Sequence, residues 1–241
     1  MTTVKFRIER RQRDPQWSEY DVPVRERTTV VEALDWIRSH VDATLMYRHS
    51  CHHGSCGTCG MLVNGKQLLA CTAPVLNLVE LEVERGMEPV IELRPLQTMD
   101  LIGDLATDPT RLFRDYPVDG GYLRPSEVNK GSAHPEEISG YVRFENCIEC
   151  GLCVSVCPVI PLRGFMGPAG LAAYNRELDK HPERSDELLP QVDAPEGAWG
   201  CDRHLLCSVV CPTGVYPAKQ IAVLKRKIET WREQKGDSEH A

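Results

Sequence analysis

The sequence predicts an α+β protein, in which a mixed α/β N-terminal domain is followed by a mainly α-helical C-terminal domain. β-Favouring residues that alternate or run together fall within about the first hundred residues. Beyond Cys147, helix-forming residues place apolar side chains three and four positions apart. The length of 241 residues suits two compact units. We therefore expect domains over residues 1–100 and 141–241, joined by a linker segment over residues 101–140.

The first elements are expected in the order strand, strand, helix. Residues 4–9 and 20–24 have the composition of strands. Thr29 and Glu32 form a capping box, in which each side chain accepts a hydrogen bond from the backbone N–H group of the other residue. This box predicts a helix that continues to about Arg38.

A tight hairpin is expected at Asn64-Gly65, because this pair suits the positive φ angles of a type I′ turn. Its strands, residues 61–63 and 67–70, carry Cys71 back toward a glycine-bearing cysteine loop. Two further strands are expected over residues 78–84 and 90–93. The order of these elements resembles the β-grasp fold of plant-type ferredoxins.

The composition changes after Pro95. Residues 96–140 are rich in Asp, Pro and Gly, which favours a linker with local structure and one short helix near residues 101–106. Two longer helices are expected in the C-terminal domain, in the segments GPAGLAAYNRELDKH and PAKQIAVLKRKIETWREQ.

The composition also narrows the function. A net charge of −7 without basic blocks argues against nucleic-acid binding, because phosphate recognition needs clustered Lys and Arg. The N-terminal segment has no secretory pattern, so we expect a reducing compartment in which thiolates are available to metal. Apolar runs are too short to span a bilayer, so membrane attachment would come through a partner.

The first of three cysteine runs has the spacing of a plant-type [2Fe-2S] centre. Cysteines at x4 and x2 spacing with a fourth further along can wrap one compact cluster, and glycines between them let the loop curl. A zinc site is the bland alternative, but the spacings are far more specific than a bare CxxC pair. The predicted ligands are Cys51, Cys56, Cys59 and Cys71.

The other two runs have the bacterial ferredoxin spacing, in which the last cysteine, followed by proline, serves the other cluster. The second run has all four cysteines, but the third has His204 where its second cysteine would stand. The cross-ligation rule assigns Cys147, Cys150, Cys153 and Cys211 to a [4Fe-4S] cluster. It leaves Cys157, Cys201 and Cys207, and three thiolates favour a [3Fe-4S] cluster. All eleven cysteines are then used.

The chain resembles the iron-sulfur subunit of succinate dehydrogenase and fumarate reductase, the complex II family. The resemblance covers nearly the whole chain and rests on YRHSCHHGSCGTCGMLVNGKQLLAC, CIECGLCVSVCP, GPAGLAAY and CDRHLLCSVVCP. It implies a separate FAD-containing flavoprotein subunit beside the [2Fe-2S] cluster, and a transmembrane anchor with its quinone beside the [3Fe-4S] cluster. It also implies a peripheral membrane protein held by these partners. The lack of a transit peptide suggests the cytoplasmic face of a bacterial plasma membrane.

The residues agree with an electron carrier in which a partner subunit performs the reaction on the organic substrate. No Gly-x-Gly-x-x-Gly fingerprint follows a strand, and no Ser-His-Asp or Cys-His set has a recognisable local signature. No catalytic residue is therefore assigned in this chain.

His204 leaves three interpretations open. An imidazole can block a fourth iron, hydrogen-bond the cluster, or ligate iron. Ubiquinone-reducing relatives usually have a tryptophan after the Cys-Pro pair and a histidine after the cysteine that matches Cys201, but here Asp202 follows Cys201. The familiar pocket is therefore not carried over intact, and menaquinone or an unusual anchor subunit is an alternative. Pro158 matches the family pattern and His204 belongs to the run of the membrane-facing cluster, so these two residues are the expected quinone neighbours.

Three histidines crowd the first cysteine loop, at positions 49, 52 and 53. They suggest a Rieske centre, in which two histidines replace two cysteines. Four cysteines in plant-type order argue against that assignment. We expect the histidines on a loop that faces solvent or the flavoprotein.

Two other functions compete with a complex II subunit. An iron-sulfur subunit of a glycolate-oxidase or heterodisulfide-reductase type enzyme would lack this two-domain cluster order. A stand-alone hydratase would use the incomplete cluster as a Lewis acid and would need substrate-binding basic residues around it. Such residues are not identifiable in the sequence.

Overall fold

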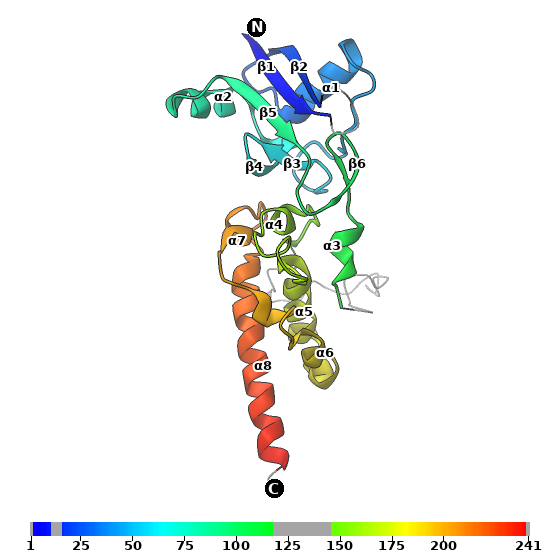
Figure 1. Ribbon diagram of the computed structural model, residues 1–241, viewed down its shortest axis with the longest axis vertical. Helices are drawn as coiled ribbons and strands as arrows, with labels where there is room; N and C mark the ends of the chain where they lie inside the picture. The colour runs from blue at the N-terminus through cyan, green and yellow to red at the C-terminus, as the bar shows by residue number, and fades with distance from the viewer. Residues whose placement is uncertain (1, 11–15, 118–145, 240–241) are drawn as a thin grey trace, which may run out of the picture. The chain divides into compact units, whose positions relative to one another are not determined.

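The computed structural model describes residues 2–10, 16–117 and 146–239. The chain forms two compact units (Figure 1), which are Met1–Arg111 with Ile148–Val156 and Leu112–Cys147 with Cys157–Ala241. The predicted linker residues 118–140 lie outside the described residues. No helix of the described part is both long and apolar enough to cross a membrane.

The first unit is built on a five-stranded sheet with the order β2-β1-β5-β3-β4. β1 and β5 are parallel, and the other neighbouring strands are antiparallel. Strands β1 and β2 contain the two segments expected to open the chain. The strands are β1 (Thr2–Glu9), β2 (Trp17–Val24), β3 (Gly60–Val63), β4 (Lys66–Leu69) and β5 (Val90–Arg94).

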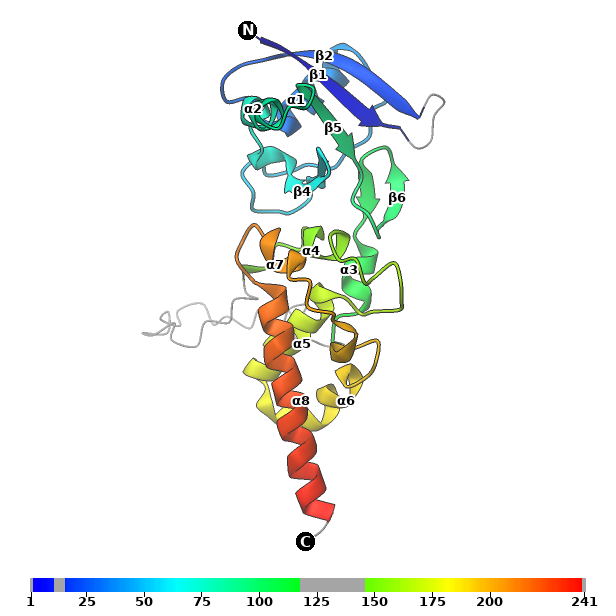
Figure 2. The same ribbon diagram turned by 60° about the vertical axis from the view of Figure 1, so that its left-hand side comes forward.

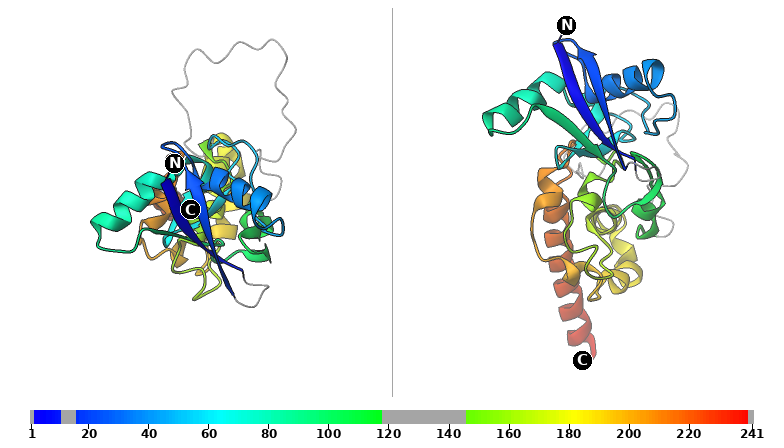
Figure 3. Two further views of the ribbon diagram at one scale, coloured as in Figure 1. Left: turned by 90° about the horizontal axis from the view of Figure 1, so that it is seen from above. Right: turned by 45° about the horizontal axis from the view of Figure 1, so that its top comes forward.

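Helix α1 (Val30–His40) packs against β2, beside the β1–β2 pair in Figure 3. The predicted capping box is present, because the side chains of Thr29 and Glu32 each accept a hydrogen bond from the other residue's backbone N–H group. Apolar side chains of α1 and of the sheet form the core of this unit, which includes Phe6, Ile8, Leu34, Ile37, Met61, Ile91 and Leu93.

The predicted hairpin joins β3 to β4. Asn64 and Gly65 have φ angles of 48° and 74°, as a type I′ turn requires. The amide oxygen of Asn64 also accepts a hydrogen bond of 2.7 Å from the backbone of Glu92, which fixes the turn against β5. The hairpin leads directly into η1 (Ala70–Thr72).

The strand expected over residues 78–84 is wrong, because these residues belong to helix α2 (Val75–Glu84). The alternation of apolar and acidic residues suggested a strand. However, β5 already has β1 on one side and β3 on the other, so the segment has no strand beside β5 to pair with. A helix satisfies its own backbone hydrogen bonds, and Leu81 and Val83 remain exposed on its surface.

The short helix expected near residues 101–106 is also wrong. This segment forms a separate two-stranded sheet from β6 (Asp100–Gly103) and β7 (Ala106–Asp108). Asp104 in the turn accepts a hydrogen bond from the backbone of Met46, and Leu105 donates to the carbonyl oxygen of Met46. The Met46–Asp104 contact links positions 58 residues apart, and together the two contacts hold the turn in place.

The described helices after Asn146 confirm the mainly helical C-terminal part. α5 lies within the first segment predicted to be helical, α8 contains the second, and the two helices lie side by side in Figures 1 and 2. The predicted fold class is therefore confirmed. These elements, with one that precedes them, are α3 (Thr110–Arg114), α4 (Leu152–Ser155), α5 (Pro168–Lys180), η3 (Pro182–Arg184), α6 (Ser185–Val192), η4 (Ala198–Gly200), α7 (Leu206–Val209) and α8 (Pro217–Glu239).

Candidate metal centres

All eleven cysteines lie in the described part of the chain, and none of them forms a disulfide. Three cysteines of the first run lie in the loop between α1 and β3, and Cys71 lies in η1. The hairpin carries Cys71 back to this loop, because the N–H group of Ala70 donates to the carbonyl oxygen of Cys59 at 3.1 Å. The structure therefore brings Cys71 close to the loop that carries the other three predicted [2Fe-2S] ligands.

Backbone N–H groups of this loop point at cysteine sulfur atoms. Gly54 donates to the Sγ atom of Cys71 at 3.2 Å, and Ser55 donates to that of Cys51 at 3.2 Å. Positive φ angles at Gly54 and Gly57 allow the loop to curl in this way. Thiolate sulfur with N–H donors around it is the environment of an iron-sulfur cluster, so these residues fit a [2Fe-2S] group.

The thiols of this loop differ in acidity. Hydrogen bonds from the backbone N–H groups of His53, Cys56 and Ser55 lower the pKa of Cys51 to about 6. Burial raises the pKa of Cys59 to about 12. The Cys51 thiol is therefore the more acidic of the two.

Two glycines let the second cysteine run approach the first within the same compact unit. A Cβ atom on Gly57 would lie 2.2 Å from the carbonyl oxygen of Ile148, and one on Gly60 would lie 2.9 Å from that of Cys150. Ile148–Val156 belongs to the first unit. The backbone around Cys150 is therefore packed directly against the loop that carries Cys56 and Cys59.

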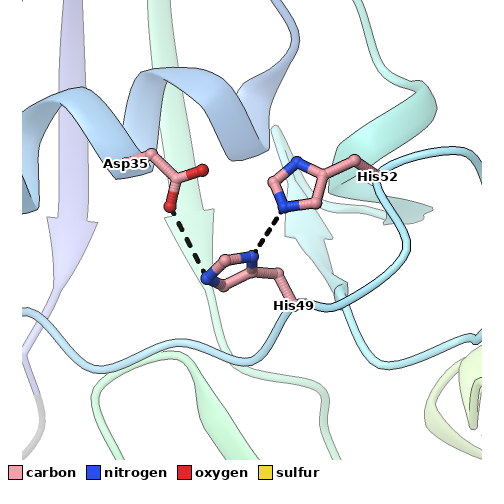
Figure 4. A group of neighbouring side chains, drawn as sticks. All are labelled: Asp35, His49 and His52. Carbon is pink, nitrogen blue, oxygen red and sulfur yellow. Dashed lines mark hydrogen bonds and ion pairs between the residues drawn. The ribbon is translucent and has the colours of Figure 1, made fainter.

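The histidines of the first loop form a group beside it. Figure 4 shows His49 between Asp35 and His52. The Nε2 atom of His49 lies 3.6 Å from an Asp35 carboxylate oxygen, and its Nδ1 atom lies 2.9 Å from Nε2 of His52. Arg38 lies 3.4 Å from the same Nε2 atom of His49. These residues contact one another, and the cysteines retain the plant-type order that argues against a Rieske centre.

The cysteines predicted to bind the [4Fe-4S] cluster are divided between the two units. Cys150 and Cys153 belong to the first unit, where Cys153 lies in α4. Cys147 and Cys211 belong to the second unit. The Sγ atom of Cys211 accepts a hydrogen bond of 3.3 Å from the backbone of Val215. This four-cysteine set stays a prediction.

The remaining three cysteines surround one pocket of the second unit. Cys157, Cys201 and Cys207 line it, and so do the two expected quinone neighbours, Pro158 and His204. Apolar side chains such as Phe165 and Ile221 close its inner side. Three thiols and one imidazole in a common pocket fit a metal cluster with three cysteine ligands.

Burial controls the acidity of two of these thiols. It raises the pKa of Cys207 to about 11 and also raises that of Cys157. Two of the leucines that line this pocket are exposed, Leu205 by 54% and Leu206 by 42%. Val209, at the end of helix α7, is 78% exposed.

Thr58 and Lys225 touch the candidate ligands, although the cysteine spacings do not point to them. The hydroxyl group of Thr58 lies 3.2 Å from the Sγ atom of Cys56. The Nζ atom of Lys225 donates to the carbonyl oxygen of Cys201 at 3.3 Å. The position of Thr58 between Cys56 and Cys59 could have indicated a hydroxyl group close to a ligand sulfur. Lys225 is 24 residues from Cys201, and no local pattern connects the two.

Family profiles match both parts of the chain. Residues 2–114 match a family described as a 2Fe-2S iron-sulfur cluster binding domain. Residues 143–215 match a family described as a 4Fe-4S dicluster domain. These matches cover all eleven cysteines.

Curated relatives and a solved structure resemble nearly the full chain. The fumarate reductase iron-sulfur subunit of Mycobacterium tuberculosis is 32% identical over 86% of this chain and 83% of that protein. The subunit of the same name from Haemophilus influenzae is 32% identical over 90% of this chain and 87% of its own. A chain of the Mycobacterium smegmatis Sdh1 complex in the apo form matches with a TM-score of 0.73 at 21% identity, covering 96% of this chain and 97% of that one.

Proposed function

This chain belongs to the family of iron-sulfur subunits of succinate dehydrogenase and fumarate reductase, and we propose that it carries electrons between an FAD-containing flavoprotein subunit and a quinone. The quinone would be bound at one or more transmembrane anchor subunits. Succinate or fumarate would react on the flavoprotein. This chain would then be a peripheral membrane protein, held by its partners at the cytoplasmic face of a bacterial plasma membrane.

The proposed ligands are the eleven cysteines in sets of four, four and three. When bound, the [2Fe-2S], [4Fe-4S] and [3Fe-4S] clusters would supply one-electron redox sites. The chain supplies backbone N–H donors to cysteine sulfur atoms in both units, and these donors would tune the redox potentials. The close packing of Gly57 against Ile148 supports transfer between the first two cysteine sets, because electron transfer slows steeply with distance.

One observation carries the proposal furthest, namely the pocket of the second unit. Its three cysteines with no fourth thiol suit a [3Fe-4S] cluster. Leu205 and Leu206, which line that pocket, have exposed side chains, and so has Val209 in the helix that follows Leu205. Exposed apolar side chains suit contact with an apolar subunit. We infer that this side of the second unit meets the membrane anchor, with Pro158 and His204 nearest the quinone.

Purification from the native membrane tests the proposal. We expect the chain to co-purify with an FAD protein and a hydrophobic subunit, and the complex to oxidise succinate with quinone in a malonate-sensitive reaction. Cys207→Ser should remove the oxidised [3Fe-4S] signal in electron paramagnetic resonance (EPR) and leave the reduced [2Fe-2S] signal in place. A soluble monomer that is active without partners would contradict the proposal.

A further inference from the structure

Cys150 lies at the centre of a loop with an unusual backbone. The residues on either side of it, Glu149 and Gly151, both have positive φ angles, of 56° and 74°. Gly151 is the left-handed N-cap of the four-residue helix α4, which carries Cys153. In this arrangement the cysteine at the centre projects from a tight curl whose ends are also cysteines, as a cluster-wrapping loop requires.

His204 lies at the centre of a loop with the same backbone. Arg203 and Leu205, on either side of it, have φ angles of 59° and 64°. Leu205 is the left-handed N-cap of the four-residue helix α7, which carries Cys207. Neither flanking residue is glycine, so each costs about 1–2 kcal/mol in this conformation. The third cysteine run therefore has, at His204, the same backbone arrangement that presents Cys150 in the second run.

The side chain at this position is itself able to bind iron. His204 lines the same pocket as Cys157, Cys201 and Cys207. A neutral imidazole offers one nitrogen lone pair, and iron accepts imidazole in proteins, including at iron-sulfur clusters. The aliphatic residues that merely fill such a position offer no lone pair.

We propose that His204 is a fourth protein ligand of this pocket and binds a ferrous ion at the corner that the three thiolates leave open. The inference rests on the proposed [3Fe-4S] cluster at Cys157, Cys201 and Cys207. The reduced three-iron core is neutral, and adding Fe²⁺ gives a four-iron core with a charge of +2, so no electron is transferred in this step. One Fe–N bond would form to His204 and three Fe–S bonds to cluster sulfides, and the ferrous ion would release the water ligands that these bonds replace.

The proposal makes His204 a switch between two states of one site. An imidazole that ligates the added iron is withdrawn from the quinone, whereas an imidazole without that iron stays available to it. The supply of ferrous iron under reducing conditions then decides which of the two states the complex contains.

EPR of the complete complex tests this proposal. The complex is purified without oxygen, reduced with dithionite, incubated with ferrous ammonium sulfate, desalted and reoxidised. We expect the oxidised three-iron signal of the wild type to fall about tenfold relative to a matched His204→Ile complex, which corresponds to about 1.4 kcal/mol. In the reduced complex, pulsed EPR should show a nitrogen coupling that changes when the histidines carry ¹⁵N.

Two variants separate the outcomes. His204→Cys supplies a thiolate and should lose the three-iron signal under the same treatment. If that variant loses the signal but the wild type keeps it as fully as His204→Ile does, His204 does not ligate and the proposal is overturned. If the oxidised His204→Ile complex has no three-iron signal at all, the assignment of the three cysteines fails, and the proposal about His204 fails with it.

Discussion

The hydroxyl group of Thr58 lies 3.2 Å from the Sγ atom of Cys56, within the interval between two predicted ligands of one cluster. When Cys56 ligates iron as a thiolate, the hydroxyl group is the donor. A hydrogen bond to a ligand sulfur stabilises the reduced, more negative cluster and raises its potential. We expect Thr58→Val to lower the potential of the [2Fe-2S] centre by about 20–65 mV, the equivalent of about 0.5–1.5 kcal/mol.

The measurement is a redox titration of the reduced [2Fe-2S] EPR signal. Thr58→Ser keeps the hydroxyl group and is the matched control, so its potential should stay near that of the wild type. Equal potentials in the valine and serine variants would show that the hydroxyl group does not interact with the cluster.

Gly57 is expected to tolerate no side chain. Its φ angle is 72°, and a Cβ atom would lie 2.2 Å from the carbonyl oxygen of Ile148, a backbone atom that cannot swing aside. Gly57→Ala should reduce the free energy of unfolding by about 2–5 kcal/mol, from left-handed strain together with overpacking. The [2Fe-2S] content of the purified protein should fall as well. Denaturant unfolding followed by circular dichroism and iron analysis measure both effects.

Gly65 provides the control for that substitution. Its φ angle is 74°, but nothing lies within 4 Å of its added Cβ atom. Gly65→Ala should therefore cost only the conformational strain, about 1–2 kcal/mol, and should leave the cluster content unchanged. If the two variants lose equal stability, the approach of Ile148 to Gly57 is not what makes Gly57 necessary.

Short sequence motifs correctly predicted the elements that neighbouring residues stabilise. The capping box at Thr29 and the Asn64-Gly65 turn specify their own backbone, and both are present in the structure. The cysteine spacings indicated both cluster types before any fold was known. The family matches to a 2Fe-2S domain and a 4Fe-4S dicluster domain agree with that indication.

The wrong predictions concern segments that depend on distant contacts. Residues 78–84 alternate as a strand would, yet the neighbours of β5 were fixed by β1 and β3, far away in sequence. The turn at Asp104 is held by Met46 and by Arg10, which no spacing rule connects to it. No spacing rule connects Lys225 to Cys201 either. The contact of helix α8 with the third cysteine run could therefore not be predicted from the sequence.

The ion pair between Arg10 and Asp42 should contribute strongly to the stability of the first unit. The Arg10 side chain is fully buried and lies 2.6 Å from the Asp42 carboxylate. Burial alone would raise the pKa of Asp42, but hydrogen bonds from Thr44, Arg10 and Tyr20 hold it well below its usual value. Asp42→Asn should therefore lower the free energy of unfolding by about 3 kcal/mol at pH 7, because it leaves a buried charge without one of its partners.

The pH dependence of this effect follows from the lowered pKa of Asp42. A carboxylate whose folded pKa lies below its unfolded value of about 3.9 stabilises the protein above that pH, and the contribution fades as the pH falls toward the folded pKa. The difference in free energy of unfolding between wild type and Asp42→Asn should hence be constant from about pH 7 to pH 5 and shrink below about pH 4.

Glu19→Gln is the control for this prediction. It breaks the exposed Lys5–Glu19 pair and should change the free energy of unfolding by less than about 1 kcal/mol. A difference that persists undiminished at low pH would argue against the ion pair.

Lys225 should raise the potential of the proposed cluster at Cys157, Cys201 and Cys207. Its ammonium group donates to the carbonyl oxygen of Cys201 at 3.3 Å, so a positive charge lies beside one predicted ligand. Reduction adds a negative charge to the cluster, and the nearby cation stabilises that reduced state. We expect Lys225→Met to lower the potential by tens of millivolts, on the order of 20–60 mV. A redox titration of the oxidised three-iron EPR signal gives the value.

Two variants are controls for this prediction. Lys225→Arg keeps the charge, and Arg226→Gln removes an exposed charge one position along α8, so both should leave the potential nearly unchanged. An equal decrease in Lys225→Met and Arg226→Gln would mean that the net charge of α8, rather than the contact at Cys201, sets the potential.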